Sequence, residues 1–276
     1  MRKYLHDIFN CRNFVFYLVS SNIKAVHRHK VLGNLWTFLD PLLLMLVYYV
    51  VFALILRSAT RTPDFLIYLF VGIIVWRYFQ SCVMQACTIV KNQQGLITEV
   101  YFPKAVLPIS TVLARGYDFI WSFLPLYSMI LLFQLLKKIE PGTGFSVCLL
   151  WLPLLMVIQL AFNLGFIMFV TVAGTFFADM SNLLTAVLRF WFYMCPIFYY
   201  IDRIPEGHLY FEWLSYHNIY MLNPYAVFFT VYRTVIIDGR PPAIGNLVYV
   251  SCVSIVTLIV GFIFFRRFEG VLAKYV

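Results

Sequence analysis

Two arginines inside apolar stretches are the side chains of this sequence best placed to do chemistry. Arg77 is the only charged residue of stretch 65–90, and Arg189 is the only one of stretch 180–201. A charge within a membrane-spanning stretch is costly and usually serves a function. Because a guanidinium group matches the geometry of a phosphate, we expect both arginines to meet phosphate groups, either of a transported substrate or of lipid.

A second charged group, Arg115 with Asp118, has a different interpretation. Residues three apart lie on the same face of a helix, so these two side chains can pair. We interpret the pair as structural, with the two charges neutralising each other. A role in transport is the alternative.

Aromatic residues make up 19% of the chain, and many fall in or near the apolar stretches. Tyr and Trp anchor helices at membrane surfaces, which is the ordinary interpretation of any one of them. A subset could instead line a path for sugars, whose apolar faces stack on rings while their hydroxyls bond to Tyr. The candidates for a substrate path are Arg77, Arg189, Tyr48, Tyr49, Trp191 and Tyr193.

The sequence predicts no catalytic or metal site in this chain. It contains no nucleotide-binding loop of the GxxxxGKS/T type, and its six cysteines form no CxxC pair. Few carboxylates lie in the apolar stretches, which argues against a proton relay. Work against a gradient would therefore take its energy from a separate ATPase subunit, which would bind ATP and Mg. We expect no cofactor in this chain and no nucleic-acid partner.

The elements that must position these residues are membrane-spanning helices. The chain is 62% hydrophobic and 12% charged, against about 25% charged residues in soluble domains. Stretches such as Pro141–Ala178 and Pro241–Phe265 hold no charge, and a span needs about 20 apolar residues. Transmembrane barrel strands would alternate in polarity, and these stretches do not. We predict an all-α membrane protein with six spanning helices, at Leu35–Leu56, Asp64–Gln85, Val106–Leu136, within Phe145–Phe177, Asn182–Tyr200 and Ala243–Phe265.

The N-terminal segment predicts an amphipathic helix at the membrane interface. The apolar residues of Cys11–Lys30 fall on one helical face, namely Val15, Val19, Ile23 and Val26. Its basic residues lie largely elsewhere, among them Lys24, Arg28 and Lys30. Such a pattern is typical of a helix that lies on anionic lipid. A cytosolic helix packed on a soluble partner is the alternative.

The distribution of Lys and Arg predicts the orientation of the chain. Basic residues outnumber acidic ones most strongly near the two termini and in the loop Lys91–Lys104. Cytoplasmic segments carry such an excess, so we expect both termini in the cytoplasm.

The stretch between the fifth and sixth helices, Ile201–Pro242, does not fit a simple loop. It contains an uncharged segment, Trp213–Tyr232, which is broken by Asn223 and Pro224. Since Pro is favoured in the first turn of a helix, we predict a short helix at Tyr225–Ile237. We interpret the region as re-entrant or interfacial helices on the outer side. A seventh span is the alternative, and it would place the C-terminus outside.

Five fragments, in this order, resemble one known family. The chain is similar to the membrane subunits of type-2 ATP-binding-cassette exporters for polysaccharides, polyol phosphates and teichoic acids. The fragments are Ile23–Pro41, which resembles the basic helix and LGxLWxxLxP pattern; Asn92–Pro108, which resembles LIxxVxFPxxxLP; the PIFY of Pro196–Tyr199; the LNP of Leu222–Pro224; and the tail Arg266–Val276, which resembles the teichoic-acid branch.

The resemblance implies an assembly and a set of roles. Two copies would form a homodimeric pore with two ATPase subunits on the cytoplasmic side. A coupling segment of this chain would dock into the ATPase. Its residues are Ile97, Glu99, Val100, Tyr101, Phe102 and Pro103. The helix with Lys24, Arg28 and Lys30 would contribute to docking and to substrate uptake, and the region of Asn223 and Pro224 would close the outer exit. Glu99 departs from the family pattern, where a basic residue is common, which leaves the charge of the ATPase contact open.

We therefore expect an N-terminal interface segment, residues 1–34, and one transmembrane domain, residues 35–276, in the plasma membrane of a bacterium. The expected function is that of a permease subunit for a polyprenyl diphosphate-linked teichoic acid or related polysaccharide. One alternative is a type-2 exporter of drugs or small lipids. Another is a membrane-embedded transferase acting on a lipid-linked sugar, which would require paired carboxylates or a His near the membrane face.

Overall fold

The computed structural model describes residues 2–27, 35–51, 63–137, 139, 143–199 and 220–272, and these residues form helices and turns without a strand. The helices are α1 (Arg2–Asn10), α2 (Arg12–His27), α3 (Leu35–Tyr49), α4 (Pro63–Asn92), α5 (Gln94–Glu99), α6 (Val106–Trp121), α7 (Phe123–Leu135), the 3₁₀ helix η2 (Val147–Trp151), α8 (Leu152–Phe176), α9 (Met180–Met194), α11 (Pro224–Ile236) and α12 (Ile244–Leu272). The prediction of an all-α membrane protein is confirmed.

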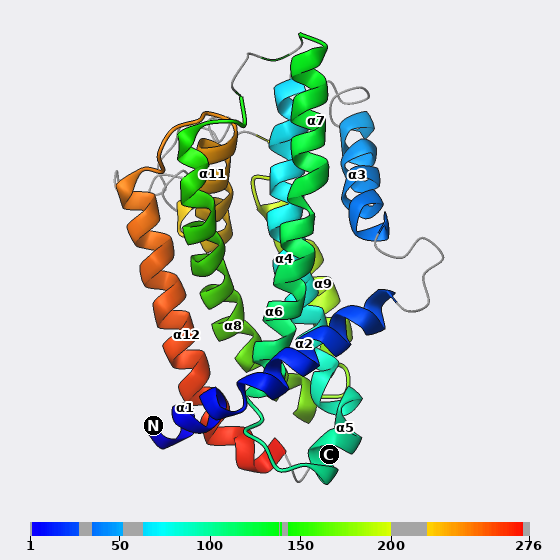
Figure 1. The fold of residues 1–276 in the computed structure, drawn as a ribbon, viewed down its shortest axis with the longest axis vertical. Coiled ribbons are helices and arrows are strands. Elements are labelled where there is room, and N and C mark those ends of the chain that lie inside the picture. The colour runs from blue at the N-terminus through cyan, green and yellow to red at the C-terminus, as the bar shows by residue number, and fades with distance from the viewer. Residues whose placement is uncertain are drawn as a thin grey trace, which may run out of the picture.

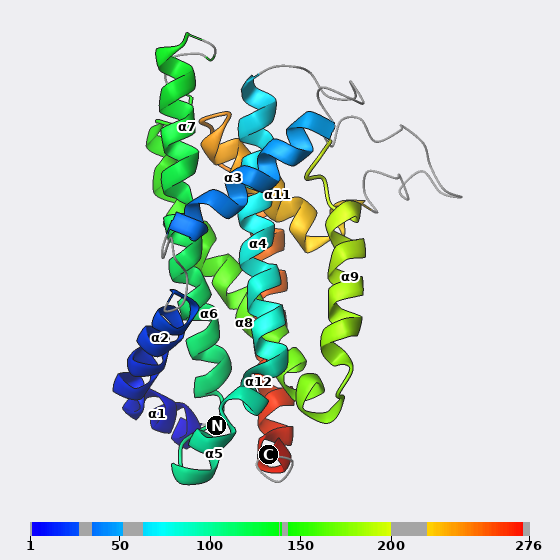
Figure 2. The ribbon, with the colours of Figure 1, turned by 90° about the vertical axis from the view of Figure 1, so that its right-hand side faces the viewer.

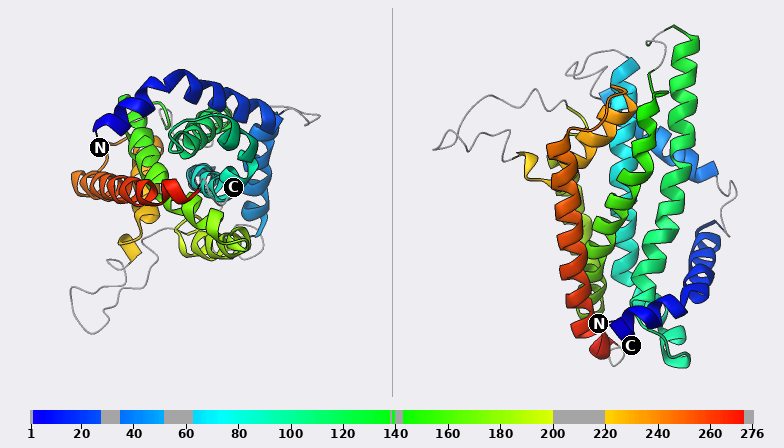
Figure 3. Two further views of the ribbon diagram at one scale, coloured as in Figure 1. Left: turned by 90° about the horizontal axis from the view of Figure 1, so that it is seen from below. Right: turned by 60° about the vertical axis from the view of Figure 1, so that its left-hand side comes forward.

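Helix α4 lies in the middle of the bundle. Its side chains are apolar on nearly every face, and a helix of this kind is stable only when it is surrounded. Phe65, Leu69 and Ile73 are accordingly at most 1% exposed. Helices α3, α6, α8, α9 and α11 all contact α4, and the view along the bundle in Figure 3 shows α4 among them.

Four segments of the described chain are long and apolar enough to cross a membrane: Phe65–Asn92, Val106–Leu135, Val147–Phe176 and Ile244–Leu272. They correspond to four of the six predicted spans. The other two fall on α3 and α9, which have 15 residues each and would rise only about 22 Å. Helix α3 also crosses α4 obliquely (Figure 2). The count of six therefore stays a prediction.

The predicted fifth span, Asn182–Tyr200, is too long at its C-terminal end. Helix α9 stops at Met194, and Cys195 has an extended backbone with φ −86 and ψ 149. The cause is Pro196, because a proline disfavours helical geometry in the residue before it. The third span is continuous but divided at Ser122 into α6 and α7. Pro125 lacks the N–H that would continue the helical hydrogen bonds there.

Helices α8 and α12 pack against each other at backbone distance. A Cβ atom on Gly165 would lie 2.4 Å from the carbonyl group of Thr257, and one on Gly261 would lie 2.2 Å from the carbonyl oxygen of Gly165. Small residues allow this close approach between helices in membranes. The contact joins α12 to the rest of the bundle through α8.

The amphipathic helix of the N-terminal segment is present as α2, which runs across the bundle beside α6 (Figure 1). Val15 and Leu18 are buried in a cluster with Ile89, Val106 and Leu107. The apolar face therefore packs on α4 and α6 of the same chain, not on a soluble partner. The opposite face of α2 exposes Phe16 and Tyr17, and the location of this helix at a membrane interface stays a prediction.

Helix α11 confirms the predicted short helix after Asn223. It has 13 residues, most of them buried, and it is too short for a seventh span by itself. It lies at the end of the bundle opposite α5, whereas the N and C marks lie at the end near α5 (Figures 1 and 2). The preceding part of the predicted re-entrant region, residues 201–219, lies outside the described residues.

Candidate functional site

A cavity of about 450 Å³ lies between α3, α4 and α9. Its lining residues are Leu44 and Tyr48 from α3, Ile73, Trp76, Arg77, Gln80 and Ser81 from α4, and Thr185, Leu188, Arg189, Phe192 and Tyr193 from α9. The structure thus brings together four of the six residues predicted to form a substrate path. The side chain of a fifth, Tyr49, lies outside the described residues.

Helical periodicity explains why these side chains meet. Residues three and four apart share a face of a helix, and the lining residues recur at this spacing on both α4 and α9. On α4, the cavity face with Arg77 and Gln80 adjoins a face with Phe79 and Cys82 that is fully buried. The polar residues Arg77, Gln80 and Ser81 are therefore on the face of this central helix that lines the cavity.

The charge of the cavity is positive. Arg77 and Arg189 both bring a guanidinium group to the cavity, and none of the lining residues is an Asp or Glu. Gln80, Ser81 and Thr185 add amide and hydroxyl groups. Such a set of donors is suited to a phosphate or diphosphate, because charge-assisted hydrogen bonds gain strength where water is scarce.

The wall of the cavity near Tyr48 and Tyr193 is aromatic. The ring of Tyr48 lies 4.4 Å from that of Phe198 and 5.8 Å from that of Phe192, and Tyr193 lies 5.8 Å from Phe198. Flat rings with hydroxyl groups can stack on a sugar and bond to it. Next to the two arginines, this wall would accept the carbohydrate part of a phosphorylated glycan.

Trp191 is the candidate path residue that does not line the cavity. Its ring packs against Trp76, Phe79 and Tyr225 at centroid distances of 5.3–5.9 Å. Its indole Nε1 donates to Oδ1 of Asn223 at 3.2 Å. Trp191 therefore connects α9 to the aromatic core and to the start of α11.

Asn223 and Pro224, predicted at an outer gate, begin α11. The Asn223 side chain accepts a hydrogen bond from the Tyr225 backbone N–H at 3.1 Å, as a residue at a helix N-cap does. Its Nδ2 donates to Sγ of Cys195 at 3.3 Å. The start of α11 is thus joined to the end of α9, and a role in gating stays a prediction.

The predicted coupling segment divides into exposed and buried residues. Tyr101 is 99% exposed and Val100 46%, and Glu99 is exposed as well. Phe102, in contrast, is 4% exposed and its ring lies 5.0 Å from that of Phe14 in α2. Ile97 and Pro103 are half-buried. The segment thus projects beyond the bundle with α5 (Figure 2) and is anchored by Phe102.

Glu269 of α12 binds the residue directly after this segment, a contact that no pattern in the sequence indicates. A carboxylate oxygen of Glu269 accepts a hydrogen bond from the backbone N–H of Lys104 at 2.6 Å. Tyr4 of α1 packs nearby, with its ring 5.9 Å from that of Phe262. Burial, with the Glu269 carboxylate close by, raises the pKa of the Tyr4 hydroxyl well above its usual value.

Of the predicted interface residues, Lys24 is exposed on α2, whereas Arg28 and Lys30 lie outside the described residues. Within the described ranges, no group of three or more His, Cys, Asp or Glu side chains could hold a metal ion.

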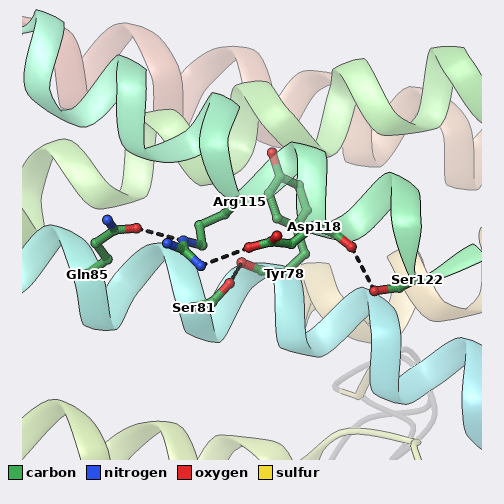
Figure 4. A network of polar contacts seen from close by, with 6 residues as sticks. All are labelled: Tyr78, Ser81, Gln85, Arg115, Asp118 and Ser122. Atoms are coloured by element: carbon green, nitrogen blue, oxygen red, sulfur yellow. Dashed lines mark hydrogen bonds and ion pairs between the residues drawn. The ribbon is translucent and has the colours of Figure 1, made fainter. Parts of the chain in front are cut away.

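The predicted pairing of Arg115 with Asp118 is confirmed. Nη1 of Arg115 lies 2.8 Å from Oδ2 of Asp118, and its Nε donates to Oε1 of Gln85 at 2.7 Å. Figure 4 shows these contacts between α6 and α4. The hydrogen bond to Gln85 joins α6 to α4, a contact that goes beyond the predicted pairing.

Arg233 is a buried charge with no role predicted from the sequence. It is 5% exposed on α11, and its guanidinium group donates to backbone carbonyls of α4 and of the segment after α9. The signal was present in the sequence, since Arg233 is the only charged residue of the predicted helix Tyr225–Ile237.

Comparison with known proteins adds the family. The model of the ABC-2 type transporter family matches residues 13–237. An O-antigen export system permease protein RfbA of Myxococcus xanthus is 29% identical over 258 residues, which cover 94% of this chain and 93% of the relative. A protein of the same name from Klebsiella pneumoniae is 26% identical, with 91% and 90% covered. The polysialic acid transport protein KpsM of Escherichia coli is 24% identical, with 86% of each chain covered. Because the family match spans most of its length, this chain belongs to the ABC-2 type transporter family.

Proposed function

We propose that this chain is the permease subunit of an ATP-driven exporter that moves a polyprenyl diphosphate-linked polysaccharide across a bacterial plasma membrane. The observation that carries the proposal is the cavity in which Arg77 and Arg189 lie beside Tyr48 and Tyr193. The relatives named for O-antigen export and polysialic acid transport support a polysaccharide as the cargo.

The cavity has separate places for the two parts of such a substrate. The guanidinium groups suit the diphosphate, because each can form paired hydrogen bonds to phosphate oxygens. The tyrosine wall suits the first sugars. A small apolar drug has no anionic group that could pair with the two arginines, so the cavity favours the glycan exporter over the drug exporter.

Pairing of two copies is the second part of the proposal. The surfaces of α3 and α9 beside the cavity expose apolar side chains, among them Leu46 and Val47 on α3 and Val187 and Phe190 on α9. A second copy that covers these faces would turn two open cavities into one continuous path. Lipid would cover the same faces in a single copy, so the number of copies in the complex is the decisive measurement.

Docking of two ATPase subunits is the third part. Tyr101 is nearly fully exposed beside Val100, and an exposed aromatic residue with an apolar neighbour is typical of a protein contact. The ATPase subunits would bind ATP and Mg and drive the motion of the coupling segment. Both ends of this chain would then lie in the cytoplasm.

Teichoic acid is the more specific cargo that the resemblance of the tail Arg266–Val276 implies. Depletion of the protein in its native host, followed by analysis of polyprenyl-linked polymers on each face of the membrane, tests this. A glycerol- or ribitol-phosphate polymer on the cytoplasmic face supports teichoic acid. Another glycan there supports export and contradicts teichoic acid. If no lipid-linked polymer accumulates, the proposed function is wrong.

A further inference from the structure

The guanidinium group of Arg233 joins three separate parts of the chain. Nε and Nη2 donate to the carbonyl oxygen of Tyr68 in α4 at 3.2 and 3.1 Å. Nη1 donates to the carbonyl oxygen of Pro196 at 2.6 Å, and Nη2 lies 3.4 Å from that of Ile197. Arg233 itself belongs to α11, so one side chain connects α4, α11 and the segment that follows α9.

The site around Arg233 is built for this side chain. The guanidinium carbon lies 3.3 Å from the centre of the Tyr68 ring, in the range of a cation–π contact. A Cβ atom on Gly72 would lie 2.7 Å from Nη2 of Arg233. Because Gly72 has no side chain, the carbonyl group of Tyr68 one turn earlier stays accessible to the arginine.

The bonds of Arg233 bear on the candidate site because α9 carries Arg189 and α4 carries Arg77. Helix α9 has only 15 residues, and its outer end is fixed by the carbonyls of Pro196 and Ile197. The hydrogen bonds of Asn223 with Trp191 and Cys195 fasten the same end to the start of α11. Any shift of this end relative to α4 would change the width of the cavity between them.

We propose that Arg233 is a positioning residue: it fixes the outer end of α9 against α4 and thereby sets the spacing between Arg77 and Arg189. The link to substrate rests on the proposed function, whereas the fixing of α9 does not. Loss of Arg233 would release the segment Cys195–Ile197 and widen the cavity without disturbing the centre of α4.

Two native cysteines report on this directly. Cys195 follows α9, Cys82 lies in the middle of α4, and both are 0% exposed. In two reporter chains, each with one of these as its single cysteine, we would measure the rate of alkylation by N-ethylmaleimide in the purified complex. In Arg233→Met we expect the rate at Cys195 to rise roughly tenfold or more, because the lost hydrogen bonds favour local opening. The rate at Cys82 should stay unchanged.

Further variants keep the test decisive if Arg233→Met does not fold. Gly72→Ala displaces the guanidinium group of Arg233 and should also raise the rate of alkylation at Cys195. Gly245→Ala, where a Cβ would meet no atom within 4 Å, is the matched control. Arg233→Lys keeps the charge and should give an intermediate rate. An unchanged alkylation rate at Cys195 in both Gly72→Ala and Arg233→Lys would overturn the proposal. It would also be overturned if the alkylation rate at Cys82 rose as much as the rate at Cys195.

The effect on the cavity needs a second measurement. We would titrate a polyprenyl diphosphate and record the concentration that half-maximally stimulates ATP hydrolysis. Gly72→Ala should raise this concentration with little change in the maximal rate, and Arg233→Lys should lie closer to the unmodified protein. If the alkylation rate at Cys195 rises but the half-maximal concentration stays the same, the link between Arg233 and the cavity is wrong. If Arg77→Gln and Arg189→Gln also leave the half-maximal concentration unchanged, the proposed function fails, whereas the proposal that Arg233 fixes α9 stands.

Discussion

Arg77 and Arg189 approach one cavity from two helices, and each can be tested separately. Replacement of either by Gln removes a cation and leaves a side chain of similar polarity. A hydrogen bond to a charged group contributes about 1.5–3 kcal/mol, so we expect each variant to lower export of the lipid-linked polymer by roughly tenfold or more. Export would be measured as polymer on the outer face at equal membrane abundance.

The control for the arginine pair is Arg240→Gln. Arg240 is exposed after α11 and does not line the cavity, so its loss should leave export unchanged. Unimpaired export in both Arg77→Gln and Arg189→Gln would contradict the assignment of the cavity as a phosphate site.

Tyr101 and Phe102 are neighbours with different expected roles. From sequence, both would dock into the ATPase, but Phe102 is buried against Phe14. Tyr101→Ala should leave abundance and thermal stability unchanged while export per ATP hydrolysed falls. The reason is that truncation of a central contact residue weakens the binding free energy by about 2 kcal/mol or more. Phe102→Ala should destabilise the protein by about 3–5 kcal/mol, as loss of a buried ring does.

The measurement is export and ATP hydrolysis on the same preparation, with melting temperature as a third reading. Tyr101→Ala with normal export per ATP would remove Tyr101 from the coupling contact. A Phe102→Ala protein that melts at the unmodified temperature would contradict its role as an anchor.

At the scale of elements, helices α8 and α12 approach each other at backbone distance through Gly165 and Gly261. Gly165→Ala places a methyl group against the backbone of Thr257, and the two helices must separate. Overpacking of this kind costs about 1–3 kcal/mol. We expect a lower melting temperature in detergent than for Gly245→Ala, a helix position with open space. Equal melting temperatures would show that the two helices are not held at this distance.

The same contact suggests how motion could travel between elements. Glu269 bonds the backbone of Lys104 directly after the coupling segment, and α12 contacts α8 along its length. A displacement of the coupling segment would therefore be felt by α12 and α8 as well as by α4 and α6.

For the whole molecule, the long apolar stretches of the sequence predicted the long helices α4, α8 and α12, and Pro224 predicted the short helix α11. The sequence-based prediction placed the end of α9 too late, because the effect of Pro196 on its neighbour outweighed the apolar character of the segment Ile197–Tyr199. It identified Arg77 and Arg189 but not their shared cavity, since nothing local in a sequence tells which helices are adjacent. Arg233 was missed because its partners are carbonyl groups, which leave no trace in the identity of a residue.

The fit between Gly72 and Arg233 has a consequence for how this fold can vary among organisms. A methyl group at position 72 would stand 2.7 Å from the guanidinium group, so the two positions are not free to change independently. A lineage that acquires alanine or serine in place of Gly72 is expected to carry a shorter side chain in place of Arg233, and a lineage that keeps the arginine is expected to keep the glycine. Correlated inheritance of these two positions would be readable from sequences alone, without a structure of any of them.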